Sequence, residues 1–271
     1  MLTFANVVWG ARCGESARRV LLGETRSRGY AYSVRLRCES ALEREAPHGL
    51  PSSRLVSTIP FDMWMVREFS AVPFERYADD ALCHCRTLKE AEALRTALEA
   101  RLAACRLVLH PQKTKIVYCQ DTNRRGTYAI VTFDFLGFTF RPRLAAWRGG
   151  LFGVSFLPAA SNTALKAIRR AIRGWSLQTR TDKALDDLAR MYAPYIRGWV
   201  NYYGQFYKSA LIPSLRRIDV HLLTWARHKF KRLRQRPRGA RLWFARVVKQ
   251  SPMLFVHWSL LYRNDRTLGA V

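Results

Sequence analysis

The hydrophobic pattern of the sequence changes at Pro158, and this change restricts the architectures open to the chain. Before Pro158, apolar residues form short runs bounded by Gly, Pro and Asp, which is typical of strands joined by turns. After it, apolar residues recur at helical spacing, as in Leu165, Ile168 and Ile172. The sequence therefore predicts an α+β unit followed by an all-α unit.

The α+β unit is predicted to cover residues 61–158. Residues 61–69 favour a short helix that Pro73 ends. Two antiparallel strands, 74–77 and 81–85, are expected on either side of a tight turn at Asp79 and Asp80. Thr87 and Glu90 form a capping box that opens a helix. Further strands are expected at 107–109, at 115–119 and at 133–140, the last bent at Gly137.

The helical unit is predicted to cover residues 159–250, followed by a tail at 251–271. Ser161 is a candidate N-cap for a helix with Trp175 on its apolar face. Thr181 is a candidate N-cap for a second helix, with Leu185, Leu188 and Met191 directed inward. Helices are also expected at 213–233 and 240–250, separated by a turn at 237–239.

Residues 1–60 differ from the rest, because they contain nine Arg but no Lys and no Asp, and show no sustained period. Three interpretations are open: a disordered leader, an Arg-rich targeting segment, or the product of a truncated or frame-shifted gene. Several Glu residues argue against the targeting segment. We favour the frame-shifted leader.

The positive charge of the chain is concentrated in the helical unit. The formal net charge is +26, and residues 165–249 contain 21 Lys and Arg against four acids. A clustered positive field of this kind indicates a nucleic-acid partner, because cationic side chains displace the counterions condensed on phosphates. An anionic membrane is the alternative. No apolar run of about 18 residues supports it, and we expect no membrane association.

The six cysteines do not predict a zinc site, because no CxxC pair occurs. Cys83, His84 and Cys85 are adjacent, but on a strand the two thiols would share one face and the imidazole the other. We expect these thiols to be buried as small apolar groups. Free thiols without a secretion signal predict a cytoplasmic protein.

Asp79 and Asp80 form the clearest candidate for a catalytic site. Two adjacent carboxylates in a tight turn repel each other, and a divalent cation such as Mg²⁺ removes this repulsion. Paired carboxylates that hold two metal ions catalyse phosphoryl transfer. The alternative is an ordinary surface turn, in which Asp pairs are common.

The residues around this pair resemble a known family. Tyr77-Ala78-Asp79-Asp80 is similar to the active-site hairpin of reverse transcriptases. Residues 107–116, with Lys113 and Thr114, resemble the next motif of that family, and Phe135-Leu136-Gly137-Phe138 resembles the element that closes its palm. Residues 161–226 resemble the maturase-specific domain of group II intron reverse transcriptases, most clearly in the stretch 196–204.

The resemblance implies a partial reverse-transcriptase palm followed by a helical thumb and maturase domain. It implies that Asp79 and Asp80 are catalytic and bind two Mg²⁺ ions. It also implies that substrate or primer contacts Tyr77, Ala78, Lys113, Leu136 and Gly137. The expected partners are group II intron RNA and a DNA target or primer, and the expected activity is RNA-directed DNA polymerisation.

The chain departs from the family at one point. The polymerase needs a third Asp on an earlier palm strand, and the sequence contains no Asp before Asp62. Asp62 itself is expected to cap a helix. Because a metal ligand and the nucleotide-binding fingers would be missing, we expect little or no polymerase activity from this chain.

The candidate RNA-binding residues are cations and aromatics of the helical unit. They are Arg169, Arg170, Arg173, Arg197, Trp199, Tyr202, Tyr203, Lys208, Arg216, Arg217, Lys229, Lys231, Arg232 and Arg234. Cations would contact phosphates and exposed aromatics would stack on bases. For the aromatics the alternative is a place in the helical core. The run 228–236 contains no acid, which favours an RNA contact.

Three functions agree with the sequence: a reverse transcriptase and maturase fragment, a non-catalytic RNA-binding protein, and a decayed remnant of a retroelement. The first two differ in whether loss of Asp79 alters an activity. The third would show an uncooperative unfolding transition.

Overall fold

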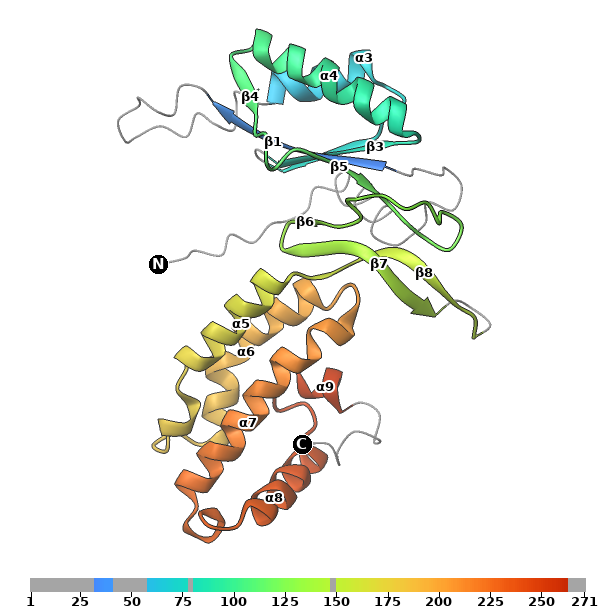
Figure 1. Cartoon of the computed structure of the whole chain (residues 1–271). Coiled ribbons are helices and arrows are strands. Elements are labelled where there is room, and N and C mark those ends of the chain that lie inside the picture. The colour runs from blue at the N-terminus through green and yellow to red at the C-terminus, as the bar shows by residue number, and fades with distance from the viewer. Residues whose placement is uncertain (1–31, 41–57, 78–79, 147–149, 263–271) are drawn as a thin grey trace, which may run out of the picture. The chain divides into compact units, whose positions relative to one another are not determined.

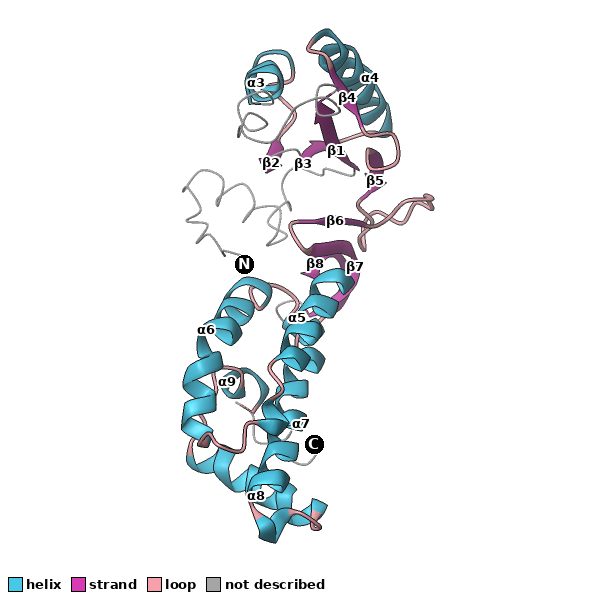
Figure 2. Cartoon of the chain, turned by 90° about the vertical axis from the view of Figure 1, so that its left-hand side faces the viewer, coloured by secondary structure: helices cyan, strands magenta, loops and turns pink. Residues whose placement is uncertain are grey.

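The computed structural model describes residues 32–40, 58–77, 80–146 and 150–262 (Figure 1). The chain divides into two compact units. The N-terminal unit contains residues up to 135 together with 140–157, and the C-terminal unit contains residues 136–139 together with those from 158 onward. The class is α+β, with antiparallel strands followed by helices (Figure 2).

The N-terminal unit is built on a sheet with strand order β2–β3–β1–β4, and β5 also pairs with β1. Its strands are β1 (Tyr32–Ser40), β2 (Phe74–Tyr77), β3 (Asp80–Cys85), β4 (Leu107–Leu109) and β5 (Lys115–Tyr118). Every pairing of β1 is antiparallel, with β3, β4 and β5 alike. Strand β1 therefore holds the sheet together.

Strand β1 lies inside the range that the sequence analysis set apart as a leader. The assignment of residues 1–60 to a leader without regular structure is wrong for residues 32–40. The sequence signal was short but present, because Val34, Leu36 and Cys38 alternate with polar residues at the period of a strand. The other predicted features of residues 1–31 and 41–57 lie outside the described residues.

Helix α4 (Leu88–Ala104) and the short helix α3 (Trp64–Glu68) lie over one face of this sheet (Figure 1). The buried residues of α4 are Ala91, Leu94, Leu98 and Leu102, which recur at helical spacing. The predicted Thr87 cap is confirmed: Thr87 Oγ1 accepts from the Glu90 amide at 3.1 Å. The Glu90 carboxylate accepts from the Arg86 amide at 2.6 Å instead of from Thr87.

Asp62 lies in η2 (Thr58–Met63), directly before α3, and does not act as the helix cap that the sequence predicted. Its carboxylate accepts two hydrogen bonds from Arg76 of β2, at 2.6 and 2.7 Å. A two-pronged guanidinium–carboxylate pair is stronger than a neutral cap bond, which explains the difference.

A second sheet has the order β6–β7–β8, with β6 (Phe133–Phe135), β7 (Phe138–Ala146) and β8 (Phe152–Ala160) (Figure 2). The sequence predicted one strand over 133–140, bent at Gly137. The structure has two strands, because Leu136 and Gly137 both adopt positive φ, 49° and 77°, and form a tight turn. Strand β8 was not predicted, although Phe152, Val154 and Phe156 alternate with Gly153 and Ser155 at the period of a strand.

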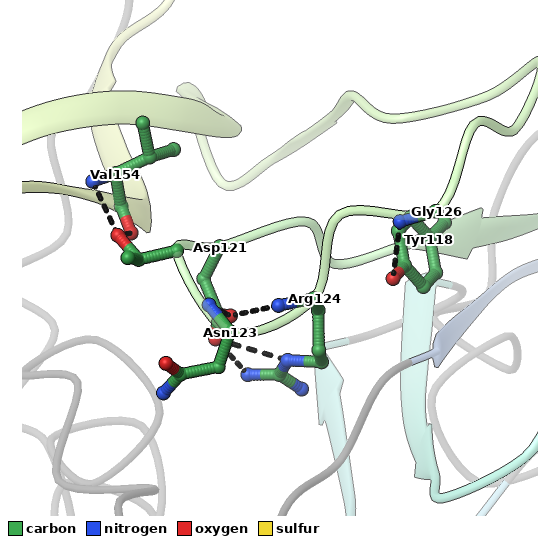
Figure 3. A network of polar contacts seen from close by, with 7 residues as sticks. Tyr118, Asp121, Asn123, Arg124, Gly126 and Val154 are labelled. Atoms are coloured by element: carbon green, nitrogen blue, oxygen red, sulfur yellow. Dashed lines mark hydrogen bonds and ion pairs between the residues drawn. The ribbon is translucent and has the colours of Figure 1, made fainter.

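A polar network joins the loop after β5 to β8 (Figure 3). Asp121 accepts from the amides of Asn123 and Arg124, both at 2.9 Å, and from the Arg124 guanidinium. Partial burial alone would raise the pKa of Asp121, but the Arg124 guanidinium and the two amides lower it overall. Thr122 and Val154 exchange hydrogen bonds of 2.8 and 2.9 Å, which fix the loop to β8.

The C-terminal unit is a set of helices packed around α7 (Ile212–Lys229). The other long helices are α5 (Asn162–Gly174), α6 (Leu185–Tyr203) and α8 (Pro237–Gln250), and α9 (Trp258–Leu261) is short. Single turns η3 (Leu177–Thr179), η4 (Lys208–Ala210) and η5 (Lys231–Leu233) lie between them. Helix α7 is central because its Leu215, Ile218, Leu222 and Trp225 are all buried.

The predicted helix starts are partly confirmed. Ser161 caps α5, accepting from the Ala164 amide at 3.1 Å. Thr181 does not cap α6, which begins at Leu185 with the Asp187 carboxylate accepting from the Ala184 amide at 3.1 Å. Met191 was predicted inward but is 41% exposed. The predicted turn at 237–239 is the first turn of α8, a position that favours proline.

A buried carboxylate ties the end of the described chain to α7. Asp219 is fully buried, and its Oδ1 accepts from His257 Nε2 and Trp258 Nε1, both at 2.9 Å. Its Oδ2 accepts from the Tyr262 hydroxyl at 2.7 Å. The prediction of a tail from residue 251 is therefore wrong for residues 255–262, which belong to the core.

We expect Asp219→Ala to lower the free energy of unfolding by about 3–5 kcal/mol, because three buried donors would lose their acceptor. Urea unfolding followed by tryptophan fluorescence measures this loss. Asp186→Ala is the matched control, since Asp186 is exposed at the start of α6 and contributes less than about 1 kcal/mol there. Equal losses in the two variants would contradict the role assigned to Asp219.

Candidate nucleic-acid interface

The hairpin of β2 and β3 carries Asp80 as the first residue of β3. In the antiparallel register Tyr77 pairs with Asp80, and Ala78 and Asp79 lie outside the described residues. Tyr77 is 50% exposed and Asp80 is partly buried. On its other side Asp80 is opposite Arg37 of β1. The predicted hairpin is confirmed.

Cys83, His84 and Cys85 of β3 are all buried. Burial raises the pKa of Cys83 well above its usual value and that of Cys85 to about 12. His84 Nε2 lies 3.5 Å from Glu75 Oε2. The thiols therefore pack as apolar groups, as predicted, and the imidazole faces a carboxylate on the neighbouring strand.

The described residues do not supply a complete site for Mg²⁺. In the part of the chain that the structure describes, no three His, Cys, Asp or Glu side chains gather in a metal-binding arrangement. The strand beside β3 places Arg37 opposite Asp80, and β1 contains no Asp. A hard cation such as Mg²⁺ requires several oxygen ligands, and the described residues around Asp80 do not provide them.

The remaining predicted primer contacts lie in two turns. Lys113 is partly buried in the turn between β4 and β5, where its amide donates to the His110 carbonyl at 3.2 Å. The Leu136 carbonyl accepts from the Tyr202 hydroxyl at 2.8 Å, and the Gly137 carbonyl accepts from the Ser161 amide at 2.9 Å. Both carbonyls are thus held by residues of the C-terminal unit.

Several predicted RNA-binding aromatics have structural contacts. The ring of Phe138 lies 5.2 Å from that of Tyr202 and 5.4 Å from those of Tyr203 and Phe206. Trp199 stacks on Trp175 with ring centroids 5.4 Å apart. Tyr203 and Trp199 are partly buried, whereas Tyr202 remains 39% exposed.

The cations of α5 form one exposed face. Lys166, Arg169, Arg170 and Arg173 are spaced by three, one and three residues, which places them along the side of α5 away from Leu165, Ile168 and Ile172. Arg169 is partly buried and the others are exposed. Among the described residues, none of the four pairs with a carboxylate. We call these four residues the α5 basic face.

The other predicted cations are placed differently. Arg197, Lys208, Arg217, Lys231, Arg232 and Arg234 are exposed, and Arg216 is partly buried. Lys229 is used within the unit: its ammonium donates to the Thr181 carbonyl at 3.0 Å and to the Lys183 carbonyl, and lies 5.4 Å from the Trp225 ring. This use of Lys229 could not be predicted, because contacts at the end of a helix depend on the fold.

Two family models match the chain in tandem. The model "Reverse transcriptase (RNA-dependent DNA polymerase)" matches residues 17–140, and the model "Group II intron, maturase-specific domain" matches residues 165–243. The chain belongs to the group II intron reverse transcriptase and maturase family. No curated protein matches it.

Membership of this family accounts for both units. The hairpin of β2 and β3 and strand β1 fall within the reverse-transcriptase match, which begins inside the range that the sequence analysis called a leader. The α5 basic face falls within the maturase-specific domain, whose role is to bind intron RNA during splicing. No described helix is long and apolar enough to cross a membrane.

We expect Gly137→Ala to lower the free energy of unfolding of this group II maturase by about 1–3 kcal/mol. The positive φ of Gly137 is strained for alanine, and the added methyl group would press on Tyr203. A Cβ at Gly137 would lie 3.0 Å from the Tyr203 hydroxyl oxygen. Thermal unfolding measures the loss. Gly150→Ala is the matched control, since Gly150 has φ of 76° but no atom near its Cβ position. If Gly150→Ala were as destabilising, the Tyr203 contact would have no role.

Proposed function

We propose that the C-terminal unit binds folded group II intron RNA through the α5 basic face and that this chain acts as a maturase without polymerase activity. The observation that supports RNA binding is the absence of any described carboxylate paired with the four cations of that face. Unneutralised cations on one helix side are costly unless a polyanion neutralises them.

The spacing of the α5 basic face suits a phosphate backbone. Residues three and four apart on a helix lie about 5–6 Å from each other, close to the separation of successive phosphates in a nucleic-acid strand. Arg170 and Arg173 can each donate two parallel hydrogen bonds to one phosphate. These contacts would position the RNA without reading its sequence.

A second basic segment lies in the same unit. Residues 231–241 contain Lys231, Arg232, Arg234, Arg236, Arg238 and Arg241 and no acid. All six are exposed. Because phosphate contacts are common to RNA and DNA, the same surface would also accept a DNA target or primer, and competition between the two nucleic acids would measure the preference.

The proposed lack of polymerase activity is supported by strand β1. A palm active site needs carboxylates on adjacent strands around the metal ions. The strand next to Asp80 has Arg37 at the paired position and contains no Asp. Because β1 adds no Asp beside Asp80, the hairpin has fewer oxygen ligands for Mg²⁺, which favours a role in which Asp79 and Asp80 are not used for catalysis.

We expect the double variant Arg170→Gln with Arg173→Gln to bind a self-splicing group II intron transcript on the order of tenfold more weakly than the wild type. The dependence of log Kd on log salt concentration should fall by about 1.5, since two phosphate contacts are lost. Fluorescence anisotropy at several salt concentrations measures both quantities.

The matched control is Arg67→Gln with Arg95→Gln, which removes the same charge from the N-terminal unit. Arg67 and Arg95 each pair with a carboxylate, Glu68 and Glu99, at 3.0 Å. The control should retain affinity and salt dependence. If both double variants lost affinity equally, only net charge would matter and the α5 basic face would not be the binding surface.

We expect no extension of a DNA primer on an RNA template by the purified chain in Mg²⁺. Incorporation of labelled nucleotide measures the activity, with a complete group II intron reverse transcriptase as the positive control. Extension that disappears in Asp79→Ala would contradict the proposal and restore a polymerase function to the hairpin.

A further inference from the structure

Gly198 occupies the middle of α6, where glycine weakens a helix relative to alanine. The fold does not require it. A Cβ added at Gly198 would meet nothing within 4 Å, whereas a Cβ at Gly204 would lie 2.3 Å from the Val200 carbonyl oxygen. Gly198 also has no positive φ. Within the part of the chain that the structure describes, nothing explains the missing side chain.

The same exposed side of α6 includes Pro194, one turn before Gly198. Proline inside a helix removes a backbone hydrogen bond. Helix α6 therefore combines two unfavourable residues on the side facing away from its buried Leu188, Tyr192 and Ile196. A surface of this kind has little side-chain volume at its centre, which lets another molecule approach the helix backbone.

The residues around Gly198 are suited to ribose and phosphate. Tyr195, three residues before, is 52% exposed, and Tyr202, four residues after, is 39% exposed. Arg197 and Asn201 are exposed beside them, and Arg197 has no carboxylate partner among the described residues. No acid occurs in α6 after Asp187, which is bonded to Arg190 and to the Ala184 amide.

We propose that the ribose–phosphate backbone of bound RNA lies directly against α6 at Gly198. Tyr195 and Tyr202 would flank the strand, Arg197 would contact a phosphate, and Asn201 would contact a phosphate or a 2′-hydroxyl. This inference rests on the proposed RNA binding and extends it from the α5 basic face to a second helix. A polyanion fits this surface because Arg197 is exposed without a described carboxylate partner and no acid follows Asp187 in α6.

The decisive variant is Gly198→Ala in the full chain. Removing glycine from a helix should raise the melting temperature by about 2–4 °C. At the same time the added methyl group should weaken binding of a fluorescein-labelled RNA stem–loop on the order of tenfold. Gly198→Gln should weaken binding further at similar stability. The opposite signs of the two effects distinguish a contact surface from a structural glycine.

Thr96→Ala is the control. It improves helix propensity on α4, where Thr96 donates to the Glu92 carbonyl at 3.2 Å beside acidic residues. This variant should become more stable with unchanged RNA affinity. A lower melting temperature in Gly198→Ala, or RNA affinity within about twofold of the wild type, would overturn the proposal.

Three further outcomes bear on this inference and on the function on which it rests. If Arg170→Gln with Arg173→Gln loses affinity but Gly198→Ala does not, the contact at Gly198 is refuted and RNA binding stands. If the wild type fails to bind the stem–loop, both fall. If Gly198→Ala alters only self-association in sedimentation, the surface binds protein and the proposal is overturned.

Discussion

The helices of the C-terminal unit must stay packed although they carry many like charges. The buried hydrogen bonds of Asp219 help to hold them together. Residues 165–249 contain 21 cations and four acids, so their mutual repulsion favours unfolding. Asp219 is the buried acid among them, and it accepts hydrogen bonds from His257, Trp258 and Tyr262. It thereby joins α7 to the segment around α9, and the apolar core around Trp225 is closed by that segment. Most of the cations are exposed.

The N-terminal unit depends in a similar way on β1, which pairs with three other strands. This pairing also places a residue of β1 opposite Asp80 of the hairpin. In the register of the sheet Arg37 is paired with Asp80, and β1 contributes no Asp beside it. The family relationship fixes the ancestry of the hairpin, whereas the chemistry open to this chain follows from its neighbours.

Local signals predicted the parts of the fold that local interactions determine. Ser161 and Thr87 cap helices as their sequences indicate, since a cap bond is made within one turn. Thr181 was misassigned as a helix cap because the Asp187 carboxylate bonds the Ala184 amide at the start of α6. Asp62 was misassigned because its carboxylate pairs with Arg76. Strand β1 was missed because one short alternating run among Arg and Ser residues is a weak signal. The strand is stabilised by pairing with β3, which is distant in sequence.

The sequence predicted the positions of some candidate site residues but not the contacts that others make within the fold. The position of Asp80 in a hairpin and the exposure of Arg170 and Arg173 agree with the sequence pattern. The roles of Trp199, Tyr203 and Lys229 could not be predicted, because helical spacing is the same for a core residue and for a surface contact. Only the fold shows that Lys229 bonds to the Thr181 carbonyl and that Tyr203 packs on Phe138.

The turn at Leu136 and Gly137 has a consequence for dividing this chain into fragments. Residues 136–139 precede Pro158 in sequence yet belong to the helical unit, so the polypeptide passes between the units three times. The ring of Phe138 packs against the rings of Tyr202, Tyr203 and Phe206. A recombinant fragment starting at Pro158 would expose the rings of Tyr202, Tyr203 and Phe206 to water. It would also lose the Leu136 carbonyl, which accepts from the Tyr202 hydroxyl. A self-contained maturase fragment would have to include the β6–β7 turn, and with it β7 and β8.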